Sequence, residues 1–152
     1  MIAPEQPGAR GAGRVLAIDL GTRRIGVALS DPTGTIASPL ETLSVTGPRR
    51  AVEQVADLCR RHGVAAVVVG WPRNMDGSRG PAAKEAEAFA ERLRPAAAVP
   101  VELWDERLST AAAERALIDA DVRRDERRRS RDRVAAAVIL QGYLDARRTR
   151  LR

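Results

Sequence analysis

Asp19 is the first residue of this chain whose position predicts chemistry. It follows the apolar residues 15–18 and precedes Leu20, Gly21 and Thr22. A carboxylate beside buried apolar side chains is costly unless it has a partner, and an acid on a rigid core strand can hold a metal ion or handle a phosphate group. Gly21 and Thr22 predict a tight turn that lets the backbone approach a ligand. The alternative is an Asx turn, in which Asp19 binds its own backbone.

A pair of acids, Asp105 and Glu106, follows an expected strand at residues 99–104. Neighbouring side chains at the end of a strand point in opposite directions, so only one of the two carboxylates is expected to face a site. The alternative is that both acids stabilise the start of the following helix through its dipole. The spacing of these residues does not choose between the two carboxylates.

Asp132 is the third acid, in the first turn of the last expected helix. The helix dipole alone would favour an acid there. However, Asp132 lies at helical spacing on the same face as Ala135, Ala136, Ile139 and Tyr143, which is the face expected to pack against the sheet. A solvated cap has no reason to lie on an apolar face. A divalent cation is one natural partner for this carboxylate.

Three oxygen ligands from different elements suit Mg²⁺ or Mn²⁺, which are hard cations that prefer carboxylates and water. The chain has no Cys/His cluster for zinc, since Cys59 is its one cysteine and His62 its one histidine. Cys59 is expected to pack in the core, and His62 is expected at a helix C-terminus. Acids on a basic protein favour phosphodiester hydrolysis, in which two metal ions about 4 Å apart activate a water and stabilise the leaving oxygen.

The charge composition favours a polyanionic partner. The chain of 152 residues carries a net charge of +6, and all of its 26 basic residues except Lys84 are arginines. The planar guanidinium binds phosphate through paired hydrogen bonds, so nucleic acid is the expected partner. The alternative is a compositional habit of the source genome, because alanine is also abundant. Aromatic residues make up 3% of the chain, so base stacking along a long single strand is not expected to dominate recognition.

The hydrophobic pattern predicts the elements that position these residues. Three short strand-like segments separated by turn signals predict an antiparallel meander. Amphipathic helical segments then alternate with apolar strand segments, as in βαβ units. The expected strands are residues 14–20, 25–29, 36–43, 64–70 and 99–104. The expected helices are one from Thr46–Pro48 to His62, a second carrying Ala82 to Leu93, a third capped by Ser109 or Thr110, and a last from about Arg131 to Arg147, after a charged loop at residues 121–130.

This order predicts an α/β fold with a five-stranded mixed sheet. Three antiparallel meander strands join two parallel strands, and helices cover both faces. In such sheets ligands bind beyond the carboxyl ends of the strands. We expect one domain at residues 14–146, a flexible leader at 1–13 and a basic tail at 147–152. The sequence has no apolar run of membrane length and no signal-peptide core, which predicts a cytoplasmic protein.

Several ordered segments also carry a resemblance to a known family. They are residues 17–28, 31–40, 68–72, 76–78, 104–110 and 132–140. In these segments the chain resembles the YqgF (RuvX) family, ribonuclease-H-like proteins described as Holliday junction resolvases and as nucleases of precursor ribosomal RNA. The resemblance covers about residues 14–144 and rests on several motifs at compatible spacing.

The resemblance implies a ribonuclease-H-like sheet and a catalytic, metal-binding triad of Asp19, Glu106 and Asp132. It thereby selects Glu106 over its neighbour, and it places the segment 71–78 at the border of the site. Two positions depart from the family pattern. Trp71 stands where a smaller apolar residue is common, and Arg133 stands where glutamine is common. The second departure puts the substrate contact and the charge near the metal in doubt.

Basic and polar residues around the acids are expected to bind the phosphate backbone, with strong salt dependence. Arginines crowd the approach to Asp132 between residues 123 and 133, although such a charge run can also be a solvated loop. Residues 74–78 can likewise be a simple turn. The expected nucleic-acid-binding residues are Thr22, Arg23, Arg24, Arg73, Asn74, Arg107, Arg129 and Arg131.

Several functions remain open at this stage. The first is a metal-dependent nuclease that processes the 5′ end of pre-16S ribosomal RNA, as a monomer or homodimer in contact with ribosomal particles. The second is a Holliday junction resolvase, which needs a dimer to cut two strands symmetrically. A third is a non-catalytic RNA-binding assembly factor. A phosphotransferase is a fourth, because residues 19–22 also resemble a phosphate motif of sugar kinases, but those enzymes need two such domains.

Overall fold

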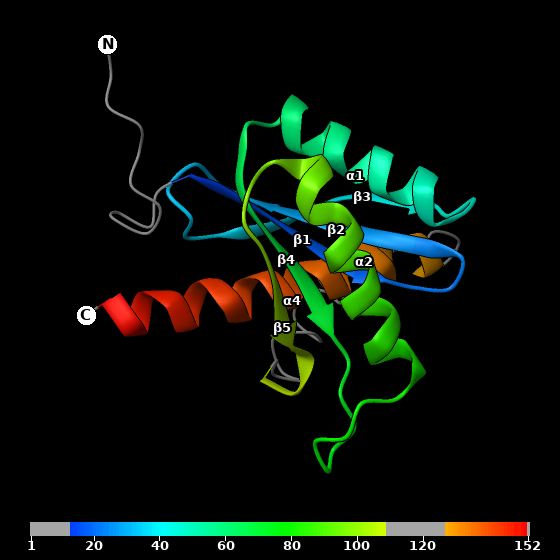
Figure 1. The fold of residues 1–152 in the computed structure, drawn as a ribbon. Coiled ribbons are helices and arrows are strands. Elements are labelled where there is room, and N and C mark those ends of the chain that lie inside the picture. Colours follow the sequence, from blue (N-terminus) through cyan, green and yellow to red (C-terminus); the bar gives the residue numbers. More distant parts are fainter. Residues whose placement is uncertain (1–12, 109–126, 152) are drawn as a thin grey trace.

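The computed structural model describes residues 13–108 and 127–151 (Figure 1). Their elements follow the order β1 (Arg14–Leu20), β2 (Arg24–Ser30), β3 (Ala37–Ser44), α1 (Pro48–Arg61), β4 (Val64–Trp71), α2 (Pro81–Ala97), β5 (Val101–Asp105), the 3-10 turn η1 (Glu106–Leu108) and α4 (Arg127–Leu151).

The five strands form one mixed sheet in the order β3-β2-β1-β4-β5. β1 pairs antiparallel with β2, and β2 with β3. β1 also pairs in parallel with β4, and β4 with β5. β1 is therefore the central strand, and its carboxyl end lies beside that of β4, with the carboxyl end of β5 next to it. The predicted sheet, with a three-stranded meander and two parallel strands, is confirmed.

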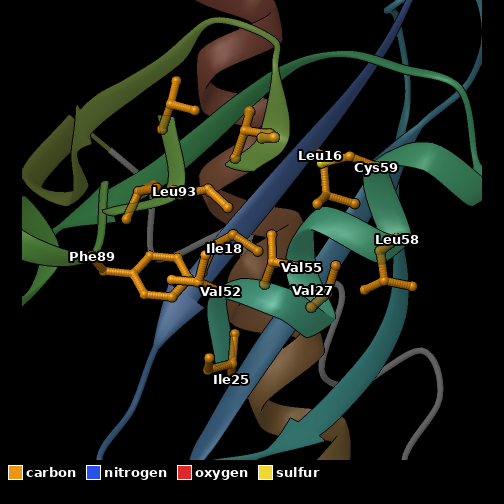
Figure 2. Close-up of a cluster of buried hydrophobic side chains, with 14 of the residues drawn as sticks. Leu16, Ile18, Ile25, Val27, Val52, Val55, Leu58, Cys59, Phe89 and Leu93 are labelled. Carbon is orange, nitrogen blue, oxygen red and sulfur yellow. The ribbon is translucent and has the colours of Figure 1, made fainter. Parts of the chain in front are cut away.

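One face of the sheet carries the larger core, which α1 and α2 cover. Figure 2 shows alternate side chains of β1 and β2, such as Ile18 and Val27, meeting Val55 of α1 and Phe89 and Leu93 of α2. These side chains are almost fully buried. Removal of apolar surface from water on this scale is the main force that fixes both helices on the sheet.

The other face is covered by α4, which lies on the opposite side of the sheet from α1 (Figure 1). The alternate residues of β1, Val15 and Ala17, belong to this second core. Polar bonds hold the helix across the sheet. The Ala37 N–H donates to Gln141 Oε1 over 2.9 Å, and Tyr143 Oη donates to Glu102 Oε1 over 2.6 Å. α4 is thus fastened from β3 to β5.

Two helix predictions need correction. α4 begins at Arg127, so residues 127–130, predicted as part of a charged loop, are helical, and Asp132 lies in the second turn. Arginine is a good helix former, so an arginine run extends the helix where its charge alone suggested a loop. α4 also continues to Leu151 instead of ending near Arg147. The predicted third helix, with its cap at Ser109 or Thr110, and the rest of the charged loop lie outside the described residues.

The turn between β2 and β3 lies at the end of the sheet opposite the carboxyl end of β1. The Asp31 carboxylate accepts backbone N–H bonds from Ile36 and Thr35, each 2.8 Å long. These bonds, with one from the Thr33 hydroxyl, hold the pKa of Asp31 well below its usual range.

None of the described helices is long and apolar enough to span a membrane.

Cys59 packs in the core on α1, as predicted, and His62 caps the end of that helix. Burial raises the pKa of the Cys59 thiol from 9.0 to about 11.

We expect iodoacetamide at pH 8 to modify Cys59 about a hundredfold more slowly in the folded protein than in urea, because far less thiolate is present. Equal rates would contradict this. The thiol loses its proton at a lower pH in the unfolded chain than in the folded protein. The free energy of unfolding therefore falls as pH rises from 9.0 to about 11.

Candidate active site at the carboxyl edge of the sheet

Asp19 lies on the α4 side of the central strand, at its carboxyl end. Side chains alternate along β1, and Val15 and Ala17 pack in the core beneath α4. Asp19 continues that series, whereas Ile18 points into the opposite core. The strand then ends in a tight turn, in which the Gly21 N–H donates to the Arg24 carbonyl over 2.9 Å. The predicted turn after the acid is confirmed.

Gly26 places Asp132 beside Asp19. Gly26 of β2 is the cross-strand partner of Asp19. A Cβ atom on Gly26 would lie 1.9 Å from the backbone oxygen of Asp132 and 2.9 Å from the backbone nitrogen of Arg133. The backbone of α4 therefore rests directly on Gly26, because no side chain separates them. This contact brings the third acid to the edge where the first one stands.

Gly70 makes the corresponding room on the other side of Asp19. β1 and β4 pair in parallel up to Ile18 and Val69, so Asp19 and Gly70 are the next residues of the two strands. A Cβ atom on Gly70 would lie 2.7 Å from Glu106 Oε2 and 2.7 Å from Ile139 Cδ1. The Glu106 carboxylate thus lies over β4, toward Asp19. The row Gly26–Asp19–Gly70 forms the floor of the candidate site.

Asp105 has a different role from Glu106. Its carboxylate binds Arg107 at 2.7 Å and lies 3.6 Å from a guanidinium nitrogen of Arg73. The hydrogen bonds from Arg107, with the charge of Arg73, hold the pKa of Asp105 below its usual range. Asp105 therefore anchors its neighbouring loop, and Glu106 is the acid directed toward the floor of the site.

The Asp132 carboxylate forms an ion pair with Arg24, at 2.6 Å between Oδ2 and Nε. Both side chains are partly exposed. Within residues 13–108 and 127–151, no three acidic, cysteine or histidine side chains stand close enough together to enclose a metal ion. The structure thus brings the backbones of the three acids to one edge and one face, while Asp132 is turned toward Arg24.

The donor chemistry of this edge fits a hard divalent cation. All three acids supply carboxylate oxygens, which Mg²⁺ and Mn²⁺ prefer. Gly26 and Gly70 carry no side chains of their own beside Asp19, which lets the α4 backbone and the Glu106 carboxylate approach the sheet there. Turning the Asp132 carboxylate from Arg24 toward Asp19 would add a third oxygen donor, and it would leave a free guanidinium at the site.

The predicted nucleic-acid-binding residues fall into four groups. Thr22, Arg23 and Arg131 are exposed. Arg24 is paired with Asp132. Arg129 lies in the first turns of α4, and its side chain is outside the described residues. The remaining three bind within the protein, since Arg73 and Arg107 hold Asp105 and Asn74 donates to Ser78 Oγ over 2.9 Å.

Sequence reasoning missed the roles of Gly26 and Gly70. A glycine inside a strand pattern indicates a bulge or the close approach of another backbone. That signal was present in both strands. The pattern could not show which element approaches, because α4 is more than a hundred residues from Gly26 in sequence.

Solved structures share this architecture. The structure of Thermus thermophilus RuvC matches with a TM-score of 0.59 and 15% identity, over 91% of this chain and 96% of that one. The structure of T. thermophilus RuvC with a Holliday junction substrate matches with a TM-score of 0.60 and 18% identity, over the same shares. These matches and the five-stranded sheet with its helices define the fold of this chain as ribonuclease-H-like.

Sequence comparison specifies the family. A family model described as "RuvX: Holliday junction resolvase" matches residues 13–146. A protein of Pelotomaculum thermopropionicum is 52% identical over 134 residues, which cover 88% of this chain and 87% of that protein. One from Geobacillus thermodenitrificans is 51% identical over 137 residues, covering 89% and 99%. Both are named as candidate pre-16S rRNA nucleases. This chain belongs to the RuvX family.

Proposed function

We propose that this chain is a divalent-metal-dependent nuclease that cleaves structured RNA, with the 5′ end of precursor 16S ribosomal RNA as its substrate. The observation that carries the proposal is the row Gly26–Asp19–Gly70, which brings Asp132 and Glu106 to either side of Asp19. The choice of RNA is supported by the names of relatives about half identical to this chain.

Asp19, Glu106 and Asp132 are the residues that would hold Mg²⁺ or Mn²⁺. A bound divalent ion supplies an activated water and stabilisation of the leaving oxygen. Arg24 has a second task in this proposal. If the Asp132 carboxylate turned to a bound cation, the Arg24 guanidinium would become available to a phosphate oxygen of the substrate.

Arginines around this edge would position the phosphate backbone. Arg23 and Arg131 are exposed, and the chain carries a net charge of +6. Binding through such contacts weakens steeply with salt, because it releases counterions from the nucleic acid. We place this activity in the cytoplasm, on RNA within ribosomal particles, as the work of a monomer or homodimer.

The test compares two substrates side by side. A precursor 16S ribosomal RNA fragment and a synthetic four-way DNA junction are incubated with the protein and Mg²⁺ or Mn²⁺, with and without excess EDTA. We expect cleavage of the RNA that EDTA abolishes. Cleavage that persists in EDTA would contradict the metal requirement. Tight RNA binding without cleavage, with or without metal, would favour a non-catalytic assembly factor.

A Holliday junction resolvase is the second candidate. It is supported by the description of the matching family model and by the fold shared with RuvC. Symmetrical cutting of a junction requires two active sites, and therefore a dimer. Paired cleavage of the DNA junction by a dimer, without cleavage of the RNA, would favour this candidate over the first.

A further inference from the structure

The loop between β4 and α2 is tightly folded. It extends past the carboxyl end of β4 (Figure 1). Asn74 and Gly77 close a β-turn through a 2.8 Å bond from the Gly77 N–H, and the Asn74 N–H donates to the Ser78 carbonyl over 2.9 Å. Gly77 has φ +89°, a backbone conformation that few other residues adopt. The side chain of Asp76 accepts a 2.9 Å bond from the Ser78 N–H.

Two arginines fasten this turn to the active-site edge. Arg73 stacks on Trp71, 4.7 Å from the ring centre, and its Nε donates to the Gly77 carbonyl over 3.1 Å. Arg107 Nη1 lies 3.4 Å from the Met75 carbonyl oxygen. Both guanidiniums bind Asp105, the residue directly before Glu106. Residues 105–107 therefore hold the loop in place and also carry the Glu106 carboxylate.

Met75 is the residue that this anchoring leaves outside. Its side chain is 88% exposed, more than any other large hydrophobic residue in the described part of the chain. A mobile loop could fold such a side chain back onto the surface, but both neighbours of Met75 are hydrogen bonded within the loop, and its carbonyl accepts a bond from Arg107. The backbone that carries this exposed apolar side chain is thus tied to Arg107, the residue directly after Glu106.

We infer that Met75 is a wedge that inserts into a base step of the bound nucleic acid, next to the scissile phosphate. This inference rests on the proposed function. Proteins that bend nucleic acid insert apolar side chains, methionine among them, between stacked bases. Methionine is unbranched and polarisable, so it fits between bases of any identity. The recognised feature is thus a base step that opens easily, as at the end of a helix or beside a branch point.

Fluorescence of an unstacked base tests the inference. An RNA stem with a single-stranded flank and a four-way DNA junction each carry 2-aminopurine beside the helix end. Both are bound by the Asp19→Asn protein with Mg²⁺, so that cleavage does not interfere. We expect a rise in fluorescence on binding. The further substitution Met75→Ala should remove the rise and weaken binding about tenfold, and Met75→Leu should restore both.

Ile36→Ala is the matched control. Among the residues that the structure describes, Ile36 is the other large exposed hydrophobic one, 60% exposed, in the turn at the opposite end of the sheet. This variant should bind and unstack the probes like its parent. Asp105→Asn, which loosens both arginines, should reduce the fluorescence rise although Met75 is unchanged. An undiminished rise with Met75→Ala, or an equal loss with Ile36→Ala, would overturn the wedge.

The readouts separate this inference from the proposed function. Binding and fluorescence need no cleavage, so they report on Met75 even if the protein proves not to be a nuclease. If the wild type cleaves RNA and Met75→Ala cleaves it with the same KM and kcat, the nuclease stands and the wedge fails. The probe whose 2-aminopurine fluorescence rises more on binding, the RNA stem or the DNA junction, identifies the kind of nucleic acid that the loop fits.

Discussion

Asp19→Asn is expected to abolish nuclease activity while the protein stays folded and still binds RNA. Asp19 occupies the floor of the site, between Gly26 and Gly70. Asparagine has nearly the same shape but lacks the negative charge that holds a divalent cation. We expect kcat to fall by about a hundredfold or more, because charge stabilisation by a metal is worth several kcal/mol and each tenfold corresponds to about 1.4 kcal/mol.

Single-turnover cleavage, thermal unfolding and RNA binding measure this prediction together. Glu106→Gln should show the same loss, because its carboxylate lies over Gly70 on the same face. Asp57→Asn is the control, since Asp57 pairs with Arg60 and Arg61 on the exposed side of α1. It should cleave like the wild type. Cleavage by Asp19→Asn at more than a tenth of the wild-type rate would show that the acid is not essential.

Gly26→Ala is expected to lower both the stability and the activity of the protein strongly, because the added methyl group would meet backbone atoms. The new Cβ would lie 1.9 Å from the Asp132 backbone oxygen. Backbone cannot rotate away as a side chain does, so α4 must move off the sheet. Overpacking of this kind costs about 1–3 kcal/mol or more. The displacement also moves Asp132, so activity should fall even at temperatures where the variant is folded.

Urea unfolding measures the free energy of unfolding. Cleavage is measured separately, at a temperature about 20 °C below the thermal unfolding midpoint of the variant, where the variant is folded. Gly70→Ala is the matched comparison. There the added Cβ meets the ends of the Glu106 and Ile139 side chains, which can turn aside. We expect Gly70→Ala to lose less stability than Gly26→Ala but to lose activity, because Glu106 must move. Wild-type stability and activity of Gly26→Ala would contradict the packing of α4 described here.

The fold was largely predictable because the strands keep a clear pattern. The apolar runs of β1 and β4 favour buried strands, and the parallel and antiparallel pairings follow from the element order. The start of α4 was not predictable in the same way. Its first residues, 127–130, are three arginines and a serine. Their charge suggests a loop and their propensity a helix, and only packing decides between the two.

The candidate site was predictable in its residues but not in its geometry. Alternation at the end of β5 showed that Asp105 and Glu106 point apart, but not which one faces the site. The family resemblance favoured Glu106, and the contact at Gly70 agrees with it. The pairing of Arg24 with Asp132 joins residues more than a hundred positions apart. No local pattern reports such a contact, and the same holds for the anchoring of Met75 by Arg107.

The position of α4 has a consequence for the synthesis of this protein. All five strands precede α4 in the chain, so α4 is synthesised after the whole sheet. Until α4 emerges, Val15, Ala17, Ala28 and Val68 lie uncovered on one face of the sheet. Asp132 arrives with the same helix. A chain that ended before α4 would therefore leave this face of the sheet uncovered and would also lack the third acid of the proposed site.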